Sequence, residues 1–189
     1  MLEGNLVRLR AYERDDLEKA RMIYNDPDVN KFLRLDVPYP LKVEDEVKWY
    51  EGLNPFGNGA YTFAIETIAD GEFIGSCGIE AVDWKNSHAS LGIFLGKKYW
   101  NKGYGSDALS TLLDFCFSEM NLHRTYIYVF KFNERAIHTY EKIGFKVDAT
   151  LRDNVFKDGK YQDELVMSIL RSEWEEKKRK QTQAHDNER

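Results

Sequence analysis

Hydrophobic and polar residues alternate with a period of two along much of the first half of the chain, which predicts β-strands. The runs that show this period are residues 5–11, 61–68, 73–82 and 88–95. The Asp-Gly pair at 70–71 and the polar residues at 85–87 are typical of tight turns between the last three runs. We therefore predict an antiparallel meander, with helices at residues 15–24 and 43–52 ahead of it.

The second half of the chain alternates between helical and strand-like spacing. Helices are predicted at residues 106–120 and 134–143, and strands at residues 124–130, 145–151 and 163–170. The strand–helix–strand segment at 91–130 places its two strands parallel. The sequence thus predicts an α+β fold, a mixed sheet with helices on its faces, in one domain at residues 1–174. Residues 175–189 are rich in charge and lack apolar spacing, which indicates a flexible tail.

The composition is that of a globular protein, with 189 residues, 42% hydrophobic content and a net charge of -5. An acidic chain of this kind is not expected to bind nucleic acid. The sequence shows no secretory signal and no apolar run of membrane length, so we expect a cytoplasmic protein without a membrane partner. Cys77 and Cys116 lie in apolar contexts without metal-ligand spacing, which predicts buried, reduced thiols and no metal site.

Gly103 and Gly105 lie at a predicted strand-to-helix turn, close to Lys97, Lys98 and Lys102. The first N–H groups of a helix have no internal partner, and the helix dipole adds positive charge there, so such a turn can bind a phosphate. Glycine lets the phosphate approach the backbone closely. A Gly-x-Gly pair can also simply shape a tight loop, but the lysines and the helix behind it favour an anion site.

Two common nucleotide-binding motifs do not fit this turn. The residues from Gly103 to Ala108 match the dinucleotide fingerprint, but the turn lies in the middle of the chain. The next strand also ends at Lys131, where that fingerprint expects an acidic residue. Residues 92–97 are one residue too short for a nucleotide-triphosphate P-loop.

A second motif, Asn-x-x-Ala-x-x-x-Tyr-x-x-x-Gly-Phe, occupies residues 133–145. Taken alone, Asn133 and Gly144 are explained as helix caps and Tyr140 as a core aromatic residue. Together with the glycine turn, however, the motif resembles the GNAT superfamily of acetyl-CoA-dependent N-acetyltransferases. The residues at 8–10, 99–100 and 158–163 resemble its branch of ribosomal-protein N-terminal and spermidine acetyltransferases.

The resemblance implies a mostly antiparallel sheet splayed between the strands at 88–95 and 124–130, with the co-substrate acetyl-CoA in the gap. A primary amine, from a protein N-terminus or a small molecule, would attack the thioester directly, without a metal, and a homodimer is compatible with this family. Tyr140 would be the catalytic residue that protonates the departing thiolate. The residues implied to bind acetyl-CoA are Phe94, Leu95, Lys102, Gly103, Tyr104, Gly105, Ser106 and Asn133.

The sequence departs from the family pattern at two positions. Trp100 stands where the family usually has Gln or Arg, and Ser90 stands where many relatives carry a glutamate as general base. A water chain, Glu80 or Asp83 would have to replace that base. Because of Ser90, a non-catalytic CoA-binding regulator is a further alternative.

A polyamine acetyltransferase is another alternative. Acidic residues that could attract a polycation occur near the expected acceptor region at 32–58, although we interpret them as a solvated surface. These residues are Asp26, Asp28, Asp36, Glu44, Asp45 and Glu46.

Overall fold

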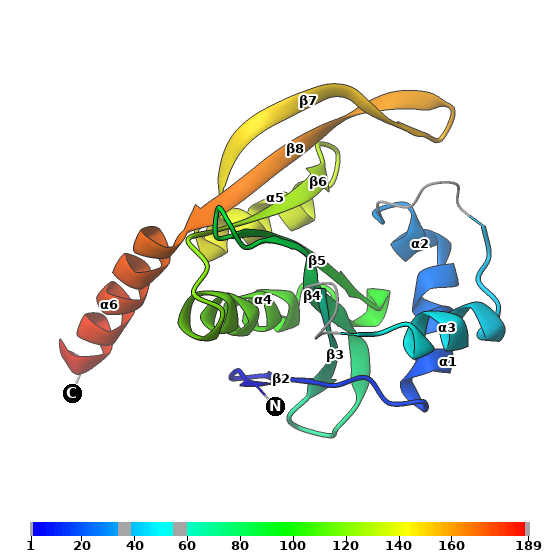
Figure 1. The fold of residues 1–189 in the computed structure, drawn as a ribbon, viewed down its shortest axis with the longest axis horizontal. Helices are drawn as coiled ribbons and strands as arrows, with labels where there is room; N and C mark the ends of the chain where they lie inside the picture. Colours follow the sequence, from blue (N-terminus) through cyan, green and yellow to red (C-terminus); the bar gives the residue numbers. More distant parts are fainter. Residues whose placement is uncertain (1, 34–38, 55–59, 188–189) are drawn as a thin grey trace.

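A computed structural model describes residues 2–33, 39–54 and 60–187 of the chain. Eight strands form one sheet in the order β1-β2-β3-β4-β5-β6-β8-β7 (Figure 1). All neighbouring strands are antiparallel except β5 and β6, which are parallel, so the predicted mixed sheet is confirmed. The strands are β1 (Leu2–Glu3), β2 (Val7–Arg10), β3 (Tyr61–Thr67), β4 (Phe73–Asp83), β5 (His88–Leu95), β6 (Arg124–Phe130), β7 (Lys146–Lys157) and β8 (Lys160–Leu170).

The predicted helices lie close to where the hydrophobic spacing places them, and the structure adds two more, at Pro27–Asn30 and Arg171–Asn187. The first helix ends just before Asp26-Pro27, and a short second helix begins at once, because proline fits the first helical position. The Asp26 carboxylate accepts the N–H of Asp28 at 2.9 Å and caps this helix. The helices are α1 (Asp16–Asn25), α2 (Pro27–Asn30), α3 (Val43–Glu51), α4 (Tyr104–Asp114), α5 (Glu134–Ile143) and α6 (Arg171–Asn187).

Helices cover both faces of the sheet, as predicted. On one face, α4 and α5 pack over the larger core, and the α4 residues Leu109, Leu112 and Leu113 are fully buried there. On the other face, α1 and α3 pack over a smaller core around Tyr12 and Phe73. The sheet therefore separates two helical layers, α4 and α5 on one face and α1 and α3 on the other.

The sheet opens between β5 and β6. These two strands pair from His88–Arg124 to Leu91–Ile127 and no further. Beyond that point β5 stays paired with β4 as far as Leu95, while β6 stays paired with β8 as far as Phe130. The remaining ends of β5 and β6 thus diverge, which confirms the predicted splay.

The hairpin of β7 and β8 is longer than the strands predicted at 145–151 and 163–170. Most residues of β7 are exposed, so no hydrophobic alternation marks the strand in the sequence. The hairpin turns at Asp158-Gly159, where both residues have positive φ angles. At its tip, buried Lys157 donates to the carbonyl of Asn30 at 3.2 Å, so the hairpin contacts the end of α2.

The charged C-terminal segment is helical up to residue 187, where the sequence predicts only a flexible tail. Trp174 is buried, and its Nε1 donates to the Asp114 carboxylate at the end of α4 at 2.9 Å. Lys177 donates to the last carbonyls of α5, at Lys142 and Ile143. These contacts explain a helix that hydrophobic spacing does not reveal, while the domain boundary at 174 and the mobility of the tail stay predictions.

Candidate active site

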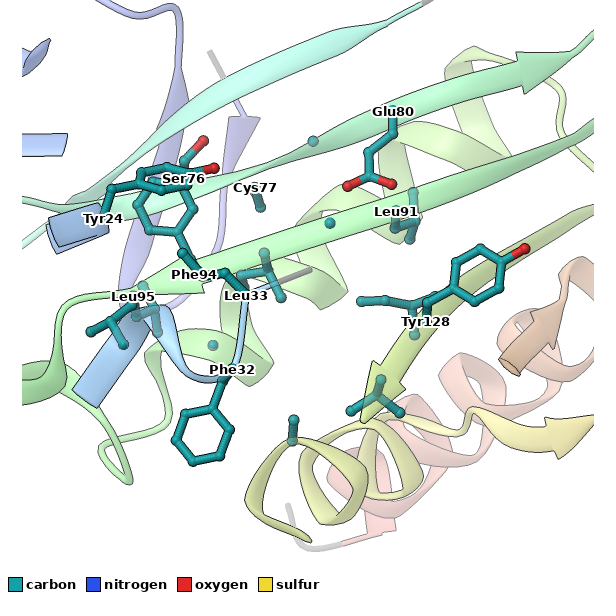
Figure 2. A pocket seen from close by; sticks show the side chains of 18 of the residues that line it. Tyr24, Phe32, Leu33, Ser76, Cys77, Glu80, Leu91, Phe94, Leu95 and Tyr128 are labelled. Atoms are coloured by element: carbon teal, nitrogen blue, oxygen red, sulfur yellow. The ribbon is translucent and has the colours of Figure 1, made fainter. Parts of the chain in front are cut away.

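A cavity of about 550 Å³ lies where the sheet opens, and residues from both helical layers line it (Figure 2). On the α1 side, the ring of Tyr24 packs edge-on against Phe94 of β5, with 4.6 Å between the ring centres. On the α5 side, the cavity is lined by Asn133, Arg135 and Tyr140. The cavity therefore connects the two faces of the sheet, so that two substrates can meet in it from opposite sides.

The glycine turn has the geometry expected of an anion site. Gly103 precedes α4 with a φ of 86°, a left-handed conformation that favours glycine, and no side chain of the described residues caps the helix there. Gly105 lines the cavity. A Cβ built at Gly105 would contact only the Leu95 side chain, at 3.4 Å, and, beyond its own helix, no other atom of the described residues within 4 Å. The space in front of Gly105 is therefore largely open. The first N–H groups of α4 are thus available to a phosphate.

Two of the three lysines expected to support this site are engaged elsewhere. Lys97 forms an ion pair with Asp28, and Lys98 forms one with Glu72 at 2.7 Å. Among the described residues, no carboxylate pairs with Lys102, which therefore keeps its charge available near the turn.

Some of the residues predicted to bind acetyl-CoA line the cavity and others only shape the turn. Lining residues are Phe94, Leu95, Gly105 and Asn133, together with the predicted catalytic residue Tyr140. The others, none of which lines the cavity, form the turn and the first residues of α4: Lys102, Gly103, Tyr104 and Ser106.

Asn133 and Leu95 each have one polar group already in use. The Oδ1 atom of Asn133 accepts the N–H of Ala136 at 3.3 Å and caps α5, which leaves the Nδ2 group as its donor toward the cavity. The Leu95 carbonyl accepts Nε1 of Trp100 at 2.8 Å. The indole that replaces the polar family residue thus holds the end of β5.

Arg135, which the sequence did not single out, lies at the same end of the cavity. Its guanidinium carbon is 3.3 Å from the centre of the Trp100 ring and 5.1 Å from that of Phe32. Burial lowers the pKa of Arg135, and no carboxylate in the described ranges pairs with it. A half-buried cation at the start of a helix, without an anionic partner, is well placed for an anionic ligand.

Tyr140 is buried in the cavity wall, with 7% of its surface exposed. Burial raises the pKa of Tyr140 above its ordinary value, the charge of Arg135 opposes this, and the charge of Glu80 adds to it. Tyr140 is therefore protonated at any working pH. A protonated hydroxyl in this position can donate a proton to a departing thiolate.

Of the residues considered for the general base, only Glu80 lines the cavity. Asp83 is the last residue of β4 and is only partly exposed; it accepts hydrogen bonds from Asn86 and lies 3.5 Å from His88. Ser90 is buried but does not line the cavity. Glu80 does line it, and Figure 2 shows its side chain leaving β4 and ending over β5.

The acidic residues near the acceptor region are not all solvated surface. Asp45 and Glu46 of α3 line the cavity, and Glu46 is buried, with 6% exposed. Burial raises the pKa of Glu46. Glu44 is exposed, Asp26 and Asp28 are engaged at α2, and Asp36 lies outside the described residues. The surface interpretation is therefore wrong for Asp45 and Glu46.

The open edges of β5 and β6 and the uncapped glycine turn fit a long ligand with a phosphate at one end. Such a ligand would lie along the unpaired part of β5, with its phosphates at the first N–H groups of α4. CoA has this shape and charge. Within the described ranges, no three His, Cys, Asp or Glu residues are grouped so that they could hold a metal ion, and no helix is long and apolar enough to cross a membrane.

The splayed sheet, the glycine turn and the buried tyrosine define an acyltransferase that uses a CoA thioester. The family of the chain is shown directly, because an acetyltransferase (GNAT) domain matches residues 7–146; the chain belongs to this family. It is an N-acetyltransferase that moves the acetyl group of acetyl-CoA to an amine, so the regulator alternative is set aside.

The relatives include enzymes of known and of putative specificity. The spermidine N(1)-acetyltransferase of Escherichia coli K12 is 29% identical over 174 residues, which are 92% of this chain and 91% of that one. The putative ribosomal N-acetyltransferase YdaF of Bacillus subtilis is 30% identical over 59% of this chain and 61% of its own. The Vibrio cholerae spermidine N-acetyltransferase, crystallised with CoA and spermine, has a TM-score of 0.81 and 27% identity over 89% of this chain and 97% of its own.

Proposed function

We propose that the acceptor is a polyamine or a similar small polycation, and the acidic lining of the cavity carries this proposal. Four carboxylates line the cavity, while Arg135 is the single cation among the described lining residues. The carboxylates are Asp45, Glu46, Glu80 and Glu164. They come from three elements of the fold, α3, β4 and β8, so more than one positive charge of a polyamine can meet a carboxylate in the cavity.

A protein N-terminus is the second candidate acceptor, favoured by the similarity to the putative ribosomal enzyme. It carries a single positive charge, however, and does not call for four carboxylates. The names of the relatives from Escherichia coli and Vibrio cholerae also support a polyamine.

In this proposal the two faces of the sheet have separate tasks. The turn at residues 102–106 and Asn133 hold the pyrophosphate and the pantetheine arm, and the backbone of Phe94 and Leu95 lies beside that arm. The thioester supplies the acetyl group. Tyr140 donates a proton to the sulfur, while the amine enters from the α1 and α3 side and is held by the carboxylates there.

An amine panel tests the acceptor class, with thiol release from acetyl-CoA as the readout. The panel contains spermine, spermidine, putrescine, lysine and a peptide with a free N-terminus. We expect spermine and spermidine to give the highest kcat/KM, and added salt to raise their KM, because exposed charges are screened. A preference for the peptide would overturn the proposal.

Carboxylate variants locate the binding site for the polycation. Glu164→Gln and Asp45→Asn are expected to raise the KM for spermine about tenfold each, since a charge-assisted hydrogen bond contributes on the order of 1.5–3 kcal/mol. Glu44→Gln is the matched control, because Glu44 is exposed on the same helix and does not line the cavity. Equal effects at positions 44 and 45 would point to general electrostatic attraction instead.

We also propose where the protein is located and that it self-associates. The free, buried thiols of Cys77 and Cys116 support the reducing cytoplasm as the location. Self-association is supported by the dodecameric structure of the Vibrio cholerae spermidine N-acetyltransferase, and light scattering of the purified chain distinguishes a homodimer from larger assemblies.

A further inference from the structure

A β-bulge in β4 determines where the Glu80 side chain lies. The pairing of β4 with β5 passes from Ile79–Leu91 to Ala81–Ser90, so Glu80 is one extra residue on its strand. Bulges bend a strand and re-aim a side chain, and they occur often beside active sites. Here the bulge lies at the cavity, and Glu80 lines it.

Gly92 on the neighbouring strand makes room for the Glu80 carboxylate. A Cβ atom built at Gly92 would lie 2.5 Å from Oε1 of Glu80 and 3.2 Å from its carboxyl carbon. The carboxylate therefore occupies the space that any other residue at position 92 would need for its side chain. Alternate residues of a strand share a face, so this is also the face of Ser90 and Phe94.

Glu80 is exposed on β4 and lines the cavity together with residues from both helical layers. Burial is the main reason that the pKa of Tyr24 is raised to about 12 and that the pKa of Tyr140 is raised, and the charge of Glu80 adds to both. One of these tyrosines belongs to α1 and the other to α5. The titratable and charged groups that line the cavity together with Glu80 are Tyr12 ahead of α1, Tyr24 from α1, Asp45 and Glu46 from α3, Cys77 from β4, Tyr128 from β6, Arg135 and Tyr140 from α5, and Glu164 from β8.

We propose that Glu80 of β4 is the general base that accepts the proton of the acceptor amine. It replaces the glutamate that many relatives carry on the neighbouring strand, at the position of Ser90. The bulge and Gly92 together bring its carboxylate to the cavity, on the face of β5 that also carries Ser90, although Ser90 itself does not line the cavity. The proposal rests on acetyl transfer alone and holds for any primary amine. The identity of the acceptor can therefore be wrong without affecting it.

The protons balance as follows for an acceptor that arrives as an ammonium ion. The nitrogen gives one proton to the Glu80 carboxylate, which passes it to water. The nitrogen then bonds to the acetyl carbon as the carbon–sulfur bond breaks. Tyr140 donates a proton to the sulfur, and the second proton lost by nitrogen replaces it. The products are an acetamide, the CoA thiol and one free proton.

Removing the carboxylate is the first test, using the best amine of the panel. Glu80→Gln is expected to lower kcat by about 10²- to 10⁴-fold and to abolish the low-pH limb of the kcat/KM profile, as removal of a general base does. Glu80→Asp is expected to restore that limb in part. Calorimetry is expected to give the same Kd for acetyl-CoA in all three proteins. A Gln variant that keeps both its rate and its low-pH limb overturns the proposal.

Gly92→Ala is the second test, because it removes no chemical group. The atom that must move is the end of a flexible side chain, so the strands can stay paired while the carboxylate is displaced. We expect Gly92→Ala to lower kcat at least tenfold, and the double variant with Glu80→Gln to be no slower than Glu80→Gln alone. Ser90→Ala, on the same strand, is the control and is expected to be mild.

The two tests separate catalysis from folding. Thermal unfolding of each variant is measured with and without acetyl-CoA, and equal shifts indicate an intact cofactor site. If the costs of Gly92→Ala and Glu80→Gln instead add in the double variant, position 92 does not act through Glu80, and the proposed arrangement is wrong.

Discussion

The Arg135 guanidinium lies directly over the Trp100 ring, 3.3 Å from its centre, and links the start of α5 to the residue that fixes the end of β5. This contact joins the two sides of the opening in the sheet. It also places an arginine near the position where the family usually has a polar residue. A polar group is thus present beside position 100 despite the exchange to tryptophan, and it comes from α5.

Arg135→Ala is expected to weaken CoA binding about tenfold with little change in kcat. A desolvated cation gains most from an anionic partner, and a hydrogen bond to a charged group contributes on the order of 1.5–3 kcal/mol. Arg135→Lys is expected to restore binding only in part, since lysine does not stack as arginine does. Calorimetry with CoA and with phosphate-free pantetheine checks this, and equal losses for both ligands would exclude a phosphate contact.

Tyr140→Phe is expected to lower kcat by about 10²- to 10⁴-fold while the Kd for acetyl-CoA changes little. The ring packs in both states, whereas the hydroxyl acts only as the sulfur leaves. Because burial raises the pKa of Tyr140, no loss of rate from its ionisation is expected up to about pH 10, the ordinary pKa of tyrosine. Tyr126→Phe is the control, since Tyr126 of β6 does not line the cavity. Equal activity of both variants would make Tyr140 a core residue only.

Gly103→Ala and Gly71→Ala form a matched pair, because both glycines have left-handed φ angles, 86° and 68°. Each substitution is expected to destabilise the fold by about 1–2 kcal/mol through backbone strain. Only Gly103→Ala is expected to reduce the thermal stabilisation by acetyl-CoA, since Gly71 lies in the turn between β3 and β4. Equal stabilisation of both variants by acetyl-CoA would show that the turn before α4 does not bind phosphate.

Glu46→Gln is expected to stabilise the fold at pH 7, because burial disfavours the charged carboxylate and the amide carries no charge. Burial raises the pKa of Glu46 in the folded state. Its contribution to stability is therefore fully present below its unfolded pKa, near 4.3, and is lost as the pH rises through the raised value. Urea unfolding of both proteins at pH 4 and pH 7 checks this, and a difference that does not grow with pH contradicts it. The same variant is expected to bind spermine more weakly.

The elements with strong hydrophobic spacing could be predicted from the sequence. The meander of β3, β4 and β5 and the apolar face of α4 carry a clear period, and the two motifs led to the family and its splayed sheet. The extended part of β7 and the helix α6 could not be predicted in this way. Most positions of β7 are exposed, and the strand is held by its pairing with β8, while α6 is held by side-chain contacts such as that of Trp174 with Asp114.

The candidate site was predictable where a motif marks it and not where partners come together only in the fold. Glu80 was named as one of three alternatives, but the bulge that aims it and the role of Gly92 depend on strand register. Nothing in the sequence singles out Arg135, although its place two residues after a capping asparagine and the exchange to Trp100 were both visible. Lys97 and Lys98 were assigned to the anion site because their distant partners, Asp28 and Glu72, could not be known.

The helix α6 contacts the last residues of α4 and α5, the two helices whose first turns contribute Gly105 and Arg135 to the cavity. Asp114, the last residue of α4, accepts hydrogen bonds from Trp174 and Lys178, and Lys177 bonds to the last carbonyls of α5. A ligand that orders the first turns of α4 and α5 therefore changes the environment of α6 from a distance. A fluorinated indole at Trp174, outside the cavity, thus becomes an NMR reporter of cofactor binding that no bound ligand touches.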